Sequence, residues 1–184
     1  MSSLDWKRLD SRYVVRDEWF TLRADIYRLP DERVIEPVYV IEYRDWVNVV
    51  ALTPAQEVVL VRQFRPGLGR IVLELPGGTM DPGESCTLEA ARRELLEETG
   101  YASAEFSALA AIAPNPASHT NMMHCYLARN VERVREPDPD DAEHLEVVLL
   151  PLDELIRMAQ RGELLQAMHL SALFFALGKL GRVA

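Results

Sequence analysis

The period of the apolar residues in this chain changes at Pro76-Gly77-Gly78. Before this turn, apolar and polar residues alternate over several stretches, as half-buried strands require, and Phe20 to Arg28 is one example. After it, the apolar residues from Thr87 to Thr99 recur at helical spacing, and Gly100 supplies a C-terminal stop. The chain therefore favours strands first and a helix inserted mid-chain, which is typical of a layered α+β domain.

The remaining elements follow from the same two periods. Further strands are expected at Ser11 to Val15, Val38 to Tyr43, Val47 to Thr53, Val58 to Phe64, Ile71 to Leu75, Phe106 to Ile112, Met122 to Ala128 and Leu145 to Leu150. Two helices, Leu152 to Arg161 and Leu164 to Leu180, are expected to end the chain. We find no internal repeat and no low-complexity segment.

Length and composition indicate a globular chain without a membrane span. With 184 residues, 48% of them hydrophobic, it can bury one good-sized core. The segment Met1 to Lys7 lacks the basic start and apolar core of a signal peptide. The longest apolar stretch, Leu164 to Leu180, is shorter than the roughly 20 residues of a membrane span. We expect a cytoplasmic protein, with Cys86 and Cys125 as reduced thiols.

The net charge limits the partners of this chain. It is −9, with 29 acidic against 20 basic residues, which argues against a protein that grips a nucleic-acid backbone over a broad surface. An acidic protein can still bind a phosphorylated small molecule if divalent cations stand between the two. The expected partner is therefore a small molecule, not nucleic acid or membrane.

Three glutamates share one face of the mid-chain helix. Positions i, i+3 and i+4 lie side by side on a helix, so Glu94, Glu97 and Glu98 form a tight carboxylate cluster. Such oxygens are ligands that magnesium or manganese prefers. The preceding Gly77-Gly78 allows a main-chain carbonyl to approach the same ion. The alternative is a solvated acidic face, paired with neighbouring arginines.

This loop and helix resemble the Nudix box, which runs Gly, five residues, Glu, seven residues, Arg-Glu-aliphatic-any-Glu-Glu-any-Gly-aliphatic. Gly78 and Glu84 match the first interval, and the run from Arg93 to Gly100 matches the end, with Tyr101 in the final aliphatic place. Eight residues instead of seven separate Glu84 from Arg93. We place the extra residue in the loop before the helix, where added length is tolerated.

The resemblance extends beyond the box. Val61 to Arg65 and Leu73 to Gly78 are similar to the stretch before the box in the ADP-ribose pyrophosphatase branch of the family. It implies a Nudix-type α/β/α sandwich with a mixed sheet, formed by residues 46–184. Residues 1–45 would be an N-terminal antiparallel β extension that forms a homodimer.

The resemblance also implies the roles of the motif residues. The Gly77 carbonyl and the carboxylates of Glu94, Glu97 and Glu98 would hold magnesium, with manganese as the alternative ion. Glu97 and Glu98 would form the catalytic centre, and Arg93 would hold the carboxylates in position by charge-assisted hydrogen bonds.

A general base and substrate contacts are also expected. Relatives of this branch take a further glutamate from a late loop, where Glu143 is the best match and Glu146 the second. The alternative is a merely solvated acidic loop. Arg65 either contacts a phosphate or pairs with Glu74, and these two readings stay open.

Aromatic side chains could stack on a nucleobase. Trp46 and Trp19 are candidates, although such tryptophans more often belong to a core or an interface. His119 and His124 have no metal-site context, and we interpret both as structural or surface residues.

The resemblance implies an enzyme, a Nudix hydrolase that cleaves the diphosphate of a nucleoside diphosphate derivative. The favoured substrate is ADP-ribose or a related sugar nucleotide, with AMP and ribose 5-phosphate as the products from ADP-ribose. A house-cleaning hydrolase of (deoxy)nucleoside triphosphates and a non-catalytic nucleotide-sensing module are the alternatives. Pro114 and Pro116 fall near a proline of ADP-ribose-active members, but residues 117–121 lack the expected glycine and acidic residue.

Overall fold

The computed structural model describes residues 4–17, 20–139 and 144–182. The chain folds into two compact units. The first comprises Met1–Arg44 together with Ala113–Met122, and the second comprises Asp45–Ile112 together with Met123–Ala184. The segment Ala113–Met122 thus belongs with strands from which it is distant in the sequence.

The first unit is built on a three-stranded antiparallel sheet in the order β1-β2-β3. Its strands are β1 (Lys7–Arg16), β2 (Thr21–Arg28) and β3 (Val34–Glu42). A hydrogen bond from the Leu29 N–H to the Arg33 carbonyl closes the turn between β2 and β3. Two shifts of register interrupt the pairing of β1 with β2, so this ladder is irregular.

The second unit contains a six-stranded sheet in the order β11-β5-β4-β9-β8, with β6 paired to β5. Its strands are β4 (Trp46–Leu52), β5 (Glu57–Arg65), β6 (Arg70–Glu74), β8 (Glu105–Ile112), β9 (Met123–Arg129) and β11 (Leu145–Pro151). Strands β4 and β9 run parallel, whereas the other pairs are antiparallel. The predicted mixed sheet is therefore confirmed.

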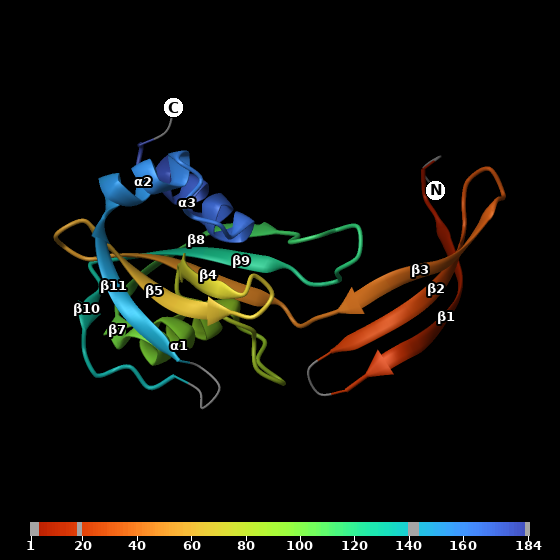
Figure 1. Cartoon of the computed structure of the whole chain (residues 1–184), viewed down its shortest axis with the longest axis horizontal. Coiled ribbons are helices and arrows are strands. Elements are labelled where there is room, and N and C mark those ends of the chain that lie inside the picture. Colours follow the sequence, from red (N-terminus) through yellow and green to blue (C-terminus); the bar gives the residue numbers. More distant parts are fainter. Residues whose placement is uncertain (1–3, 18–19, 140–143, 183–184) are drawn as a thin grey trace. The chain divides into compact units, whose positions relative to one another are not determined.

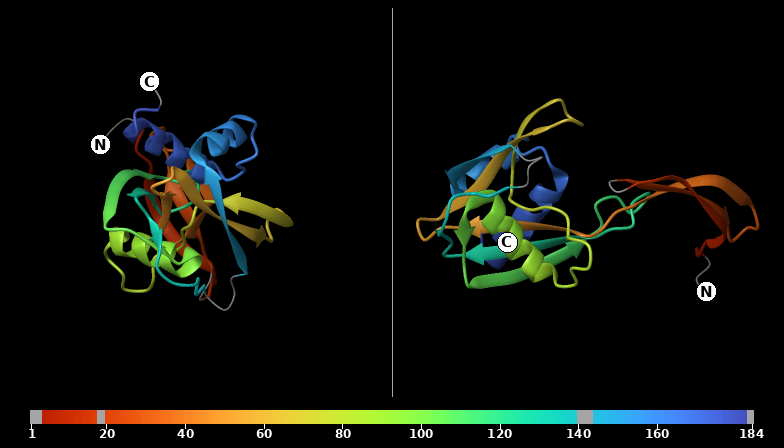
Figure 2. Two further views of the ribbon diagram at one scale, coloured as in Figure 1. Left: turned by 90° about the vertical axis from the view of Figure 1, so that its left-hand side faces the viewer. Right: turned by 90° about the horizontal axis from the view of Figure 1, so that it is seen from below.

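Helices cover both faces of this sheet (Figures 1 and 2). Helix α1 (Thr87–Thr99) packs on one face, and helices α2 (Leu152–Gln160) and α3 (Ala167–Lys179) pack on the other. Alternate residues of β4 therefore point to different cores: Val47 and Val49 toward α1, Val50 and Leu52 toward α2 and α3. The predicted α/β/α sandwich is confirmed.

Several element boundaries differ from the prediction. Strands β1 and β3 each begin four residues earlier than expected, at Lys7 and Val34. Helix α3 begins at Ala167 instead of Leu164. Leu164 was included in the predicted helix because its side chain is apolar, and it is indeed buried in the core, but from the segment before the helix. The apolar side chain continues the helical stripe although its backbone is not helical. The two-residue strands β7 (Tyr101–Ala102) and β10 (Glu132–Arg133) are too short to produce an alternating pattern.

In the described part of the chain, no helix has both the length and the apolar character that a membrane span needs.

Candidate active site

The Gly77-Gly78 turn lies against the edge of β4. The Val49 N–H donates to the Pro76 carbonyl and the Val47 N–H to the Gly78 carbonyl, each over 2.9 Å. Gly77 has a φ of +152°, and a Cβ there would lie 2.7 Å from the Cα of Asn48 and overlap the Val47 carbonyl oxygen. Only glycine therefore allows the turn to pass this close to the strand.

The carboxylates of α1 meet this turn from the other side. The Gly77 N–H donates to Glu98 Oε2 over 2.8 Å, and a Cβ on Gly78 would lie 2.6 Å from Glu94 Oε1. Glu98 is 2% exposed and Glu94 is 8% exposed, whereas the Glu97 side chain is 37% exposed. The predicted meeting of the glycine turn with the acidic helix face is thus observed for Gly77, Gly78, Glu94 and Glu98.

The helix ends as its sequence predicts. Gly100 adopts a left-handed conformation with φ +74°, and its N–H donates to the Leu96 carbonyl over 2.9 Å. This cap stops α1 directly after the glutamates, so Glu97 and Glu98 belong to its last turn. The partial negative charge of the helix C-terminus disfavours carboxylates there, and no basic side chain lies in the same turn.

Arg93 binds the surrounding carboxylates. Its Nη1 lies 3.1 Å from both Glu94 Oε1 and Glu97 Oε2, its Nη2 lies 3.2 Å from Glu84 Oε2, and its Nε lies 3.4 Å from Asp81 Oδ2. Burial opposes the charged form, yet the hydrogen bond to Glu84 and the charge of Glu94 raise the pKa of Arg93. The same contact lowers the pKa of Glu84 against its partial burial. Both groups therefore stay ionised at neutral pH.

Glu84 is well placed despite the extra residue in the box. It accepts a hydrogen bond from the Asp81 N–H over 2.9 Å and binds Arg93. Ser85 and Cys86 lie before α1, with Cys86 at its N-cap and no side-chain cap bond there. Of the segment Ser85-Cys86-Thr87, where the extra residue is placed, only Thr87 belongs to the helix. Glu84 thus remains in contact with Arg93 of α1.

The residues present suit a hard divalent cation in their chemistry. Two buried carboxylates and a glycine turn that leaves no room for a Cβ supply oxygen ligands within a confined space. Across the ranges that the structure describes, however, no three His, Cys, Asp or Glu side chains are arranged as a metal-binding group. A single nitrogen of Arg93 instead joins Glu94 to Glu97. The metal role of Gly77, Glu94, Glu97 and Glu98 stays a prediction.

Arg65 pairs with Glu74. Its Nε lies 2.7 Å from Glu74 Oε2, and the Glu74 side chain is almost fully buried. The structure therefore contains the second of the two alternatives for Arg65. The Arg65 side chain is nevertheless 42% exposed, and its proposed contact with a phosphate stays a prediction.

Trp46 packs against the core instead of standing free on the surface. It is half-buried beside the cluster that underlies α2 and α3, and its backbone forms a bridge with Thr79 next to the glycine turn. This position favours a structural contribution, and base stacking stays a prediction. Trp19 lies outside the described residues.

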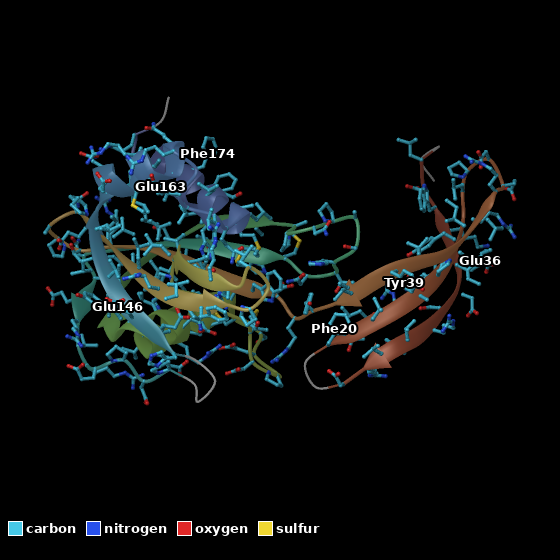
Figure 3. All side chains as sticks on the ribbon, in the orientation of Figure 1. Phe20, Glu36, Tyr39, Glu146, Glu163 and Phe174 are labelled. Carbon is cyan, nitrogen blue, oxygen red and sulfur yellow. The ribbon has the colours of Figure 1, made fainter. Side chains whose placement is uncertain are left out.

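Glu143, the expected general base, also lies outside the described residues. Glu146 is exposed on β11 (Figure 3), where its Oε2 lies 3.1 Å from Nη1 of Arg62. Glu146 is thus held in an ion pair on the strand. The role of general base stays a prediction for both Glu143 and Glu146.

Three histidines occupy structural positions. His124 Nε2 lies 2.7 Å from Asp45 Oδ2, and the His119 ring packs edge-on against Tyr43 with centroids 5.4 Å apart. His169 was not singled out from the sequence, but it is buried, and its Nδ1 accepts a hydrogen bond from the Leu75 N–H. A histidine within an apolar helical stripe was the only available signal.

Two family models match this chain. Residues 42–168 match the NUDIX domain, and residues 6–41 match the nucleoside diphosphate sugar hydrolase N-terminal domain. The second match covers most of the three-stranded sheet of the first unit. Together they cover nearly all of the elements described above.

Individual relatives agree with these matches. An ADP-ribose pyrophosphatase of Bacillus subtilis is 26% identical over 168 residues, which is 91% of this chain and 90% of that protein. The ADP compounds hydrolase NudE of Escherichia coli is 28% identical over 131 residues, covering 71% and 69%. The crystal structure of an ADP compounds hydrolase superimposes with a TM-score of 0.85 at 25% identity, covering 100% of both chains.

Proposed function

The chain belongs to the NUDIX domain family, and on that premise we propose that it hydrolyses the diphosphate bond of ADP-ribose or a related sugar nucleotide. ADP-ribose would give AMP and ribose 5-phosphate. The names of the relatives support this substrate class, because two of those compared over most of their length are an ADP-ribose pyrophosphatase and an ADP compounds hydrolase. The match of residues 6–41 to a nucleoside diphosphate sugar hydrolase domain supports it independently.

One observation carries the proposal. The glycine turn and the acidic face of α1 are in direct contact, with the Gly77 N–H bonded to Glu98 and Gly78 against the carboxylate of Glu94. Burying two carboxylates is costly unless hydrogen bonds and opposite charges offset the loss of water. A solvated acidic face, the alternative considered above, would leave both carboxylates exposed.

Members of this family generally use divalent cations, and we propose magnesium, with manganese as a substitute. The Gly77 carbonyl and the carboxylates of Glu94, Glu97 and Glu98 would hold it. When bound, the ion would neutralise the diphosphate and favour deprotonation of the attacking water. Arg93 would release or share Glu94 and Glu97 as the ion binds, while its contacts with Glu84 and Asp81 retain the guanidinium beside the cluster.

The other residues complete the proposal. Glu143 would accept the proton of the attacking water, with Glu146 as the second candidate. Arg65 would contact a phosphate of the substrate with the nitrogens not engaged by Glu74, and Trp46 would contribute to the base site. The homodimer and the cytoplasmic location stay predictions from the sequence.

The test is a substrate panel with products resolved by chromatography. ADP-ribose, other nucleoside diphosphate sugars, dinucleoside polyphosphates and nucleoside triphosphates are incubated with magnesium, with manganese, and with a chelator. We expect AMP and ribose 5-phosphate from ADP-ribose with either metal and no turnover with the chelator. Release of pyrophosphate from triphosphates alone would replace this function by the house-cleaning one. Binding without turnover of any compound would favour the sensing module.

A further inference from the structure

The first turn of α3 is tied to two strands by polar contacts. The Leu75 N–H donates to His169 Nδ1 over 3.2 Å, Gln166 Nε2 lies 3.4 Å from Glu74 Oε1, and Asn48 Nδ2 lies 3.5 Å from the Met168 carbonyl oxygen. Polar contacts are unexpected on a face that otherwise packs apolar side chains. They join α3 to the strand ends that lead into and lie beside the glycine turn.

His169 satisfies a backbone donor that the sheet does not pair. Glu74 is the last residue of β6 in register with β5, opposite Val61, and Leu75 is the next residue along the chain. Leu75 is 2% exposed and His169 is 5% exposed, so water does not offer a substitute. A buried N–H without an acceptor is destabilising, and His169 therefore fixes the place where the chain leaves the sheet.

This place is connected directly to the candidate site. Pro76 follows Leu75 and accepts a hydrogen bond from the Val49 N–H, and Gly77 then donates to Glu98. Proline restricts the backbone between the two contacts. A shift at Leu75 is therefore transmitted over two residues to the Gly77 N–H and carbonyl.

The bond requires the neutral form of the imidazole. Nδ1 accepts from Leu75, which assigns the proton of the neutral ring to Nε2. Burial lowers the pKa of His169 to about 3, and the nearby positive charge of Arg65 acts in the same direction. The carboxylate of Glu74, at the end of β6, interacts with Arg65 and Gln166. The acceptor is thus present throughout the neutral pH range.

We propose that His169 is a positioning residue, whose Nδ1 holds Leu75 so that the Gly77-Gly78 turn stays in contact with Glu98 and Glu94. The effect of His169 on catalytic rate rests on the proposed function, whereas its effect on the geometry of the Gly77-Gly78 turn does not. An ordinary core histidine would contribute only to the stability of α3. The two roles differ in whether an acceptor at the position of Nδ1 is needed.

Three variants of the full chain separate these roles. His169→Leu removes the acceptor and keeps an apolar side chain. His169→Asn restores an oxygen the same number of bonds from Cα as Nδ1. Leu173→Val trims a buried side chain of the same helix and keeps the His169 acceptor, so it reports the effect of lost packing alone.

The first readout is amide hydrogen exchange of Leu75 and Gly77 in metal-free protein, followed by NMR. We expect His169→Leu to reduce protection of both amides by about 10-fold beyond the change in global stability. His169→Asn and Leu173→Val should leave their protection relative to the global value unchanged. If the Leu variant does not fold, His169→Gln replaces it, because its oxygen stands one bond farther from Cα.

The second readout is turnover of ADP-ribose with magnesium. We expect kcat of His169→Leu to fall by about 10- to 100-fold with KM little changed, because small misplacements of catalytic groups have effects of this size. His169→Asn should recover most of the loss. Wild-type exchange and kcat in the Leu variant, or equal damage in the Asn variant, would overturn the proposal. A wild-type protein without turnover would refute the proposed function alone, since exchange still judges the role of His169.

Discussion

Two adjacent glycines should respond differently to alanine. A Cβ on Gly78 would lie 2.6, 2.9 and 2.8 Å from Oε1, Oε2 and Cδ of Glu94, which is the movable end of a side chain. Restoring an ordinary contact of 3.4 Å requires the carboxylate to retreat by about 0.8 Å, the difference between the two distances. A displacement near 1 Å in a catalytic site reduces the rate by about 100-fold. Gly78→Ala should therefore lose activity at a stability cost of about 1 kcal/mol, because the movable side chain can give way.

Gly77→Ala should instead destabilise the fold. Its Cβ would meet backbone atoms of Val47 and Asn48, and its φ of +152° is unfavourable for alanine. Strain and overlap together are expected to cost about 3 kcal/mol or more. For a chain of this size, at about 2–4 °C per kcal/mol, the melting temperature should fall by roughly 6–12 °C.

Circular dichroism melts and ADP-ribose hydrolysis measure the two effects. Gly67→Ala is the matched control, because a Cβ at Gly67 meets nothing within 4 Å, and it should change neither value. Wild-type kcat in Gly78→Ala would show that the position of the Glu94 carboxylate does not control the reaction. An unchanged melting temperature in Gly77→Ala would refute the close approach of the turn to β4.

Four further predictions concern ionisable side chains. Glu98→Gln should retain the fold and lower kcat by about 100-fold or more, because loss of a ligand exceeds the 10- to 100-fold effect of a supporting partner; near-wild-type rates would remove Glu98 from the mechanism. Arg93→Lys keeps the charge but loses the fork, so kcat should fall by about 10- to 100-fold, measured at saturating ADP-ribose. Glu143→Gln should reduce kcat more than Glu146→Gln if Glu143 is the base, and the reverse order would reassign the role. The pKa of His169 is lowered from 6.5 to about 3, so between these pH values the unfolded chain binds a proton that the folded chain does not. The free energy of unfolding should therefore decrease as the pH falls below 6.5. Thermal melts of His169→Asn should show a smaller decrease over this pH range.

The sequence predicted local structure well where one period dominates. Helix α1 spans Thr87–Thr99 and is capped by Gly100, as the helical spacing and the glycine stop indicated. The register of this helix also placed the three glutamates on one side. The contact of Glu94 and Glu98 with the glycine turn could be anticipated because only a short loop separates the two segments.

Long-range pairings were not predictable in the same way. Neither the parallel alignment of β4 with β9 nor the association of Ala113–Met122 with the first unit leaves a periodic signal. His169 illustrates the same limit, since the Leu75 N–H from which it accepts a hydrogen bond lies 94 residues away in the sequence. Its helical position indicates burial, but the unpaired Leu75 N–H that requires an acceptor emerges only from the way β6 leaves the sheet.

The charges around α1 indicate how an acidic chain could bind the proposed diphosphate substrate. Arg93 is a single positive charge in contact with four carboxylates, those of Asp81, Glu84, Glu94 and Glu97. Glu98 adds a further buried carboxylate, and a backbone N–H offsets only part of its desolvation. The surplus of negative charge repels a diphosphate but attracts a divalent cation, so we expect the diphosphate to bind only when the cation is in place. The proposed metal dependence would therefore follow from the charge balance on this helix face as much as from the individual ligands.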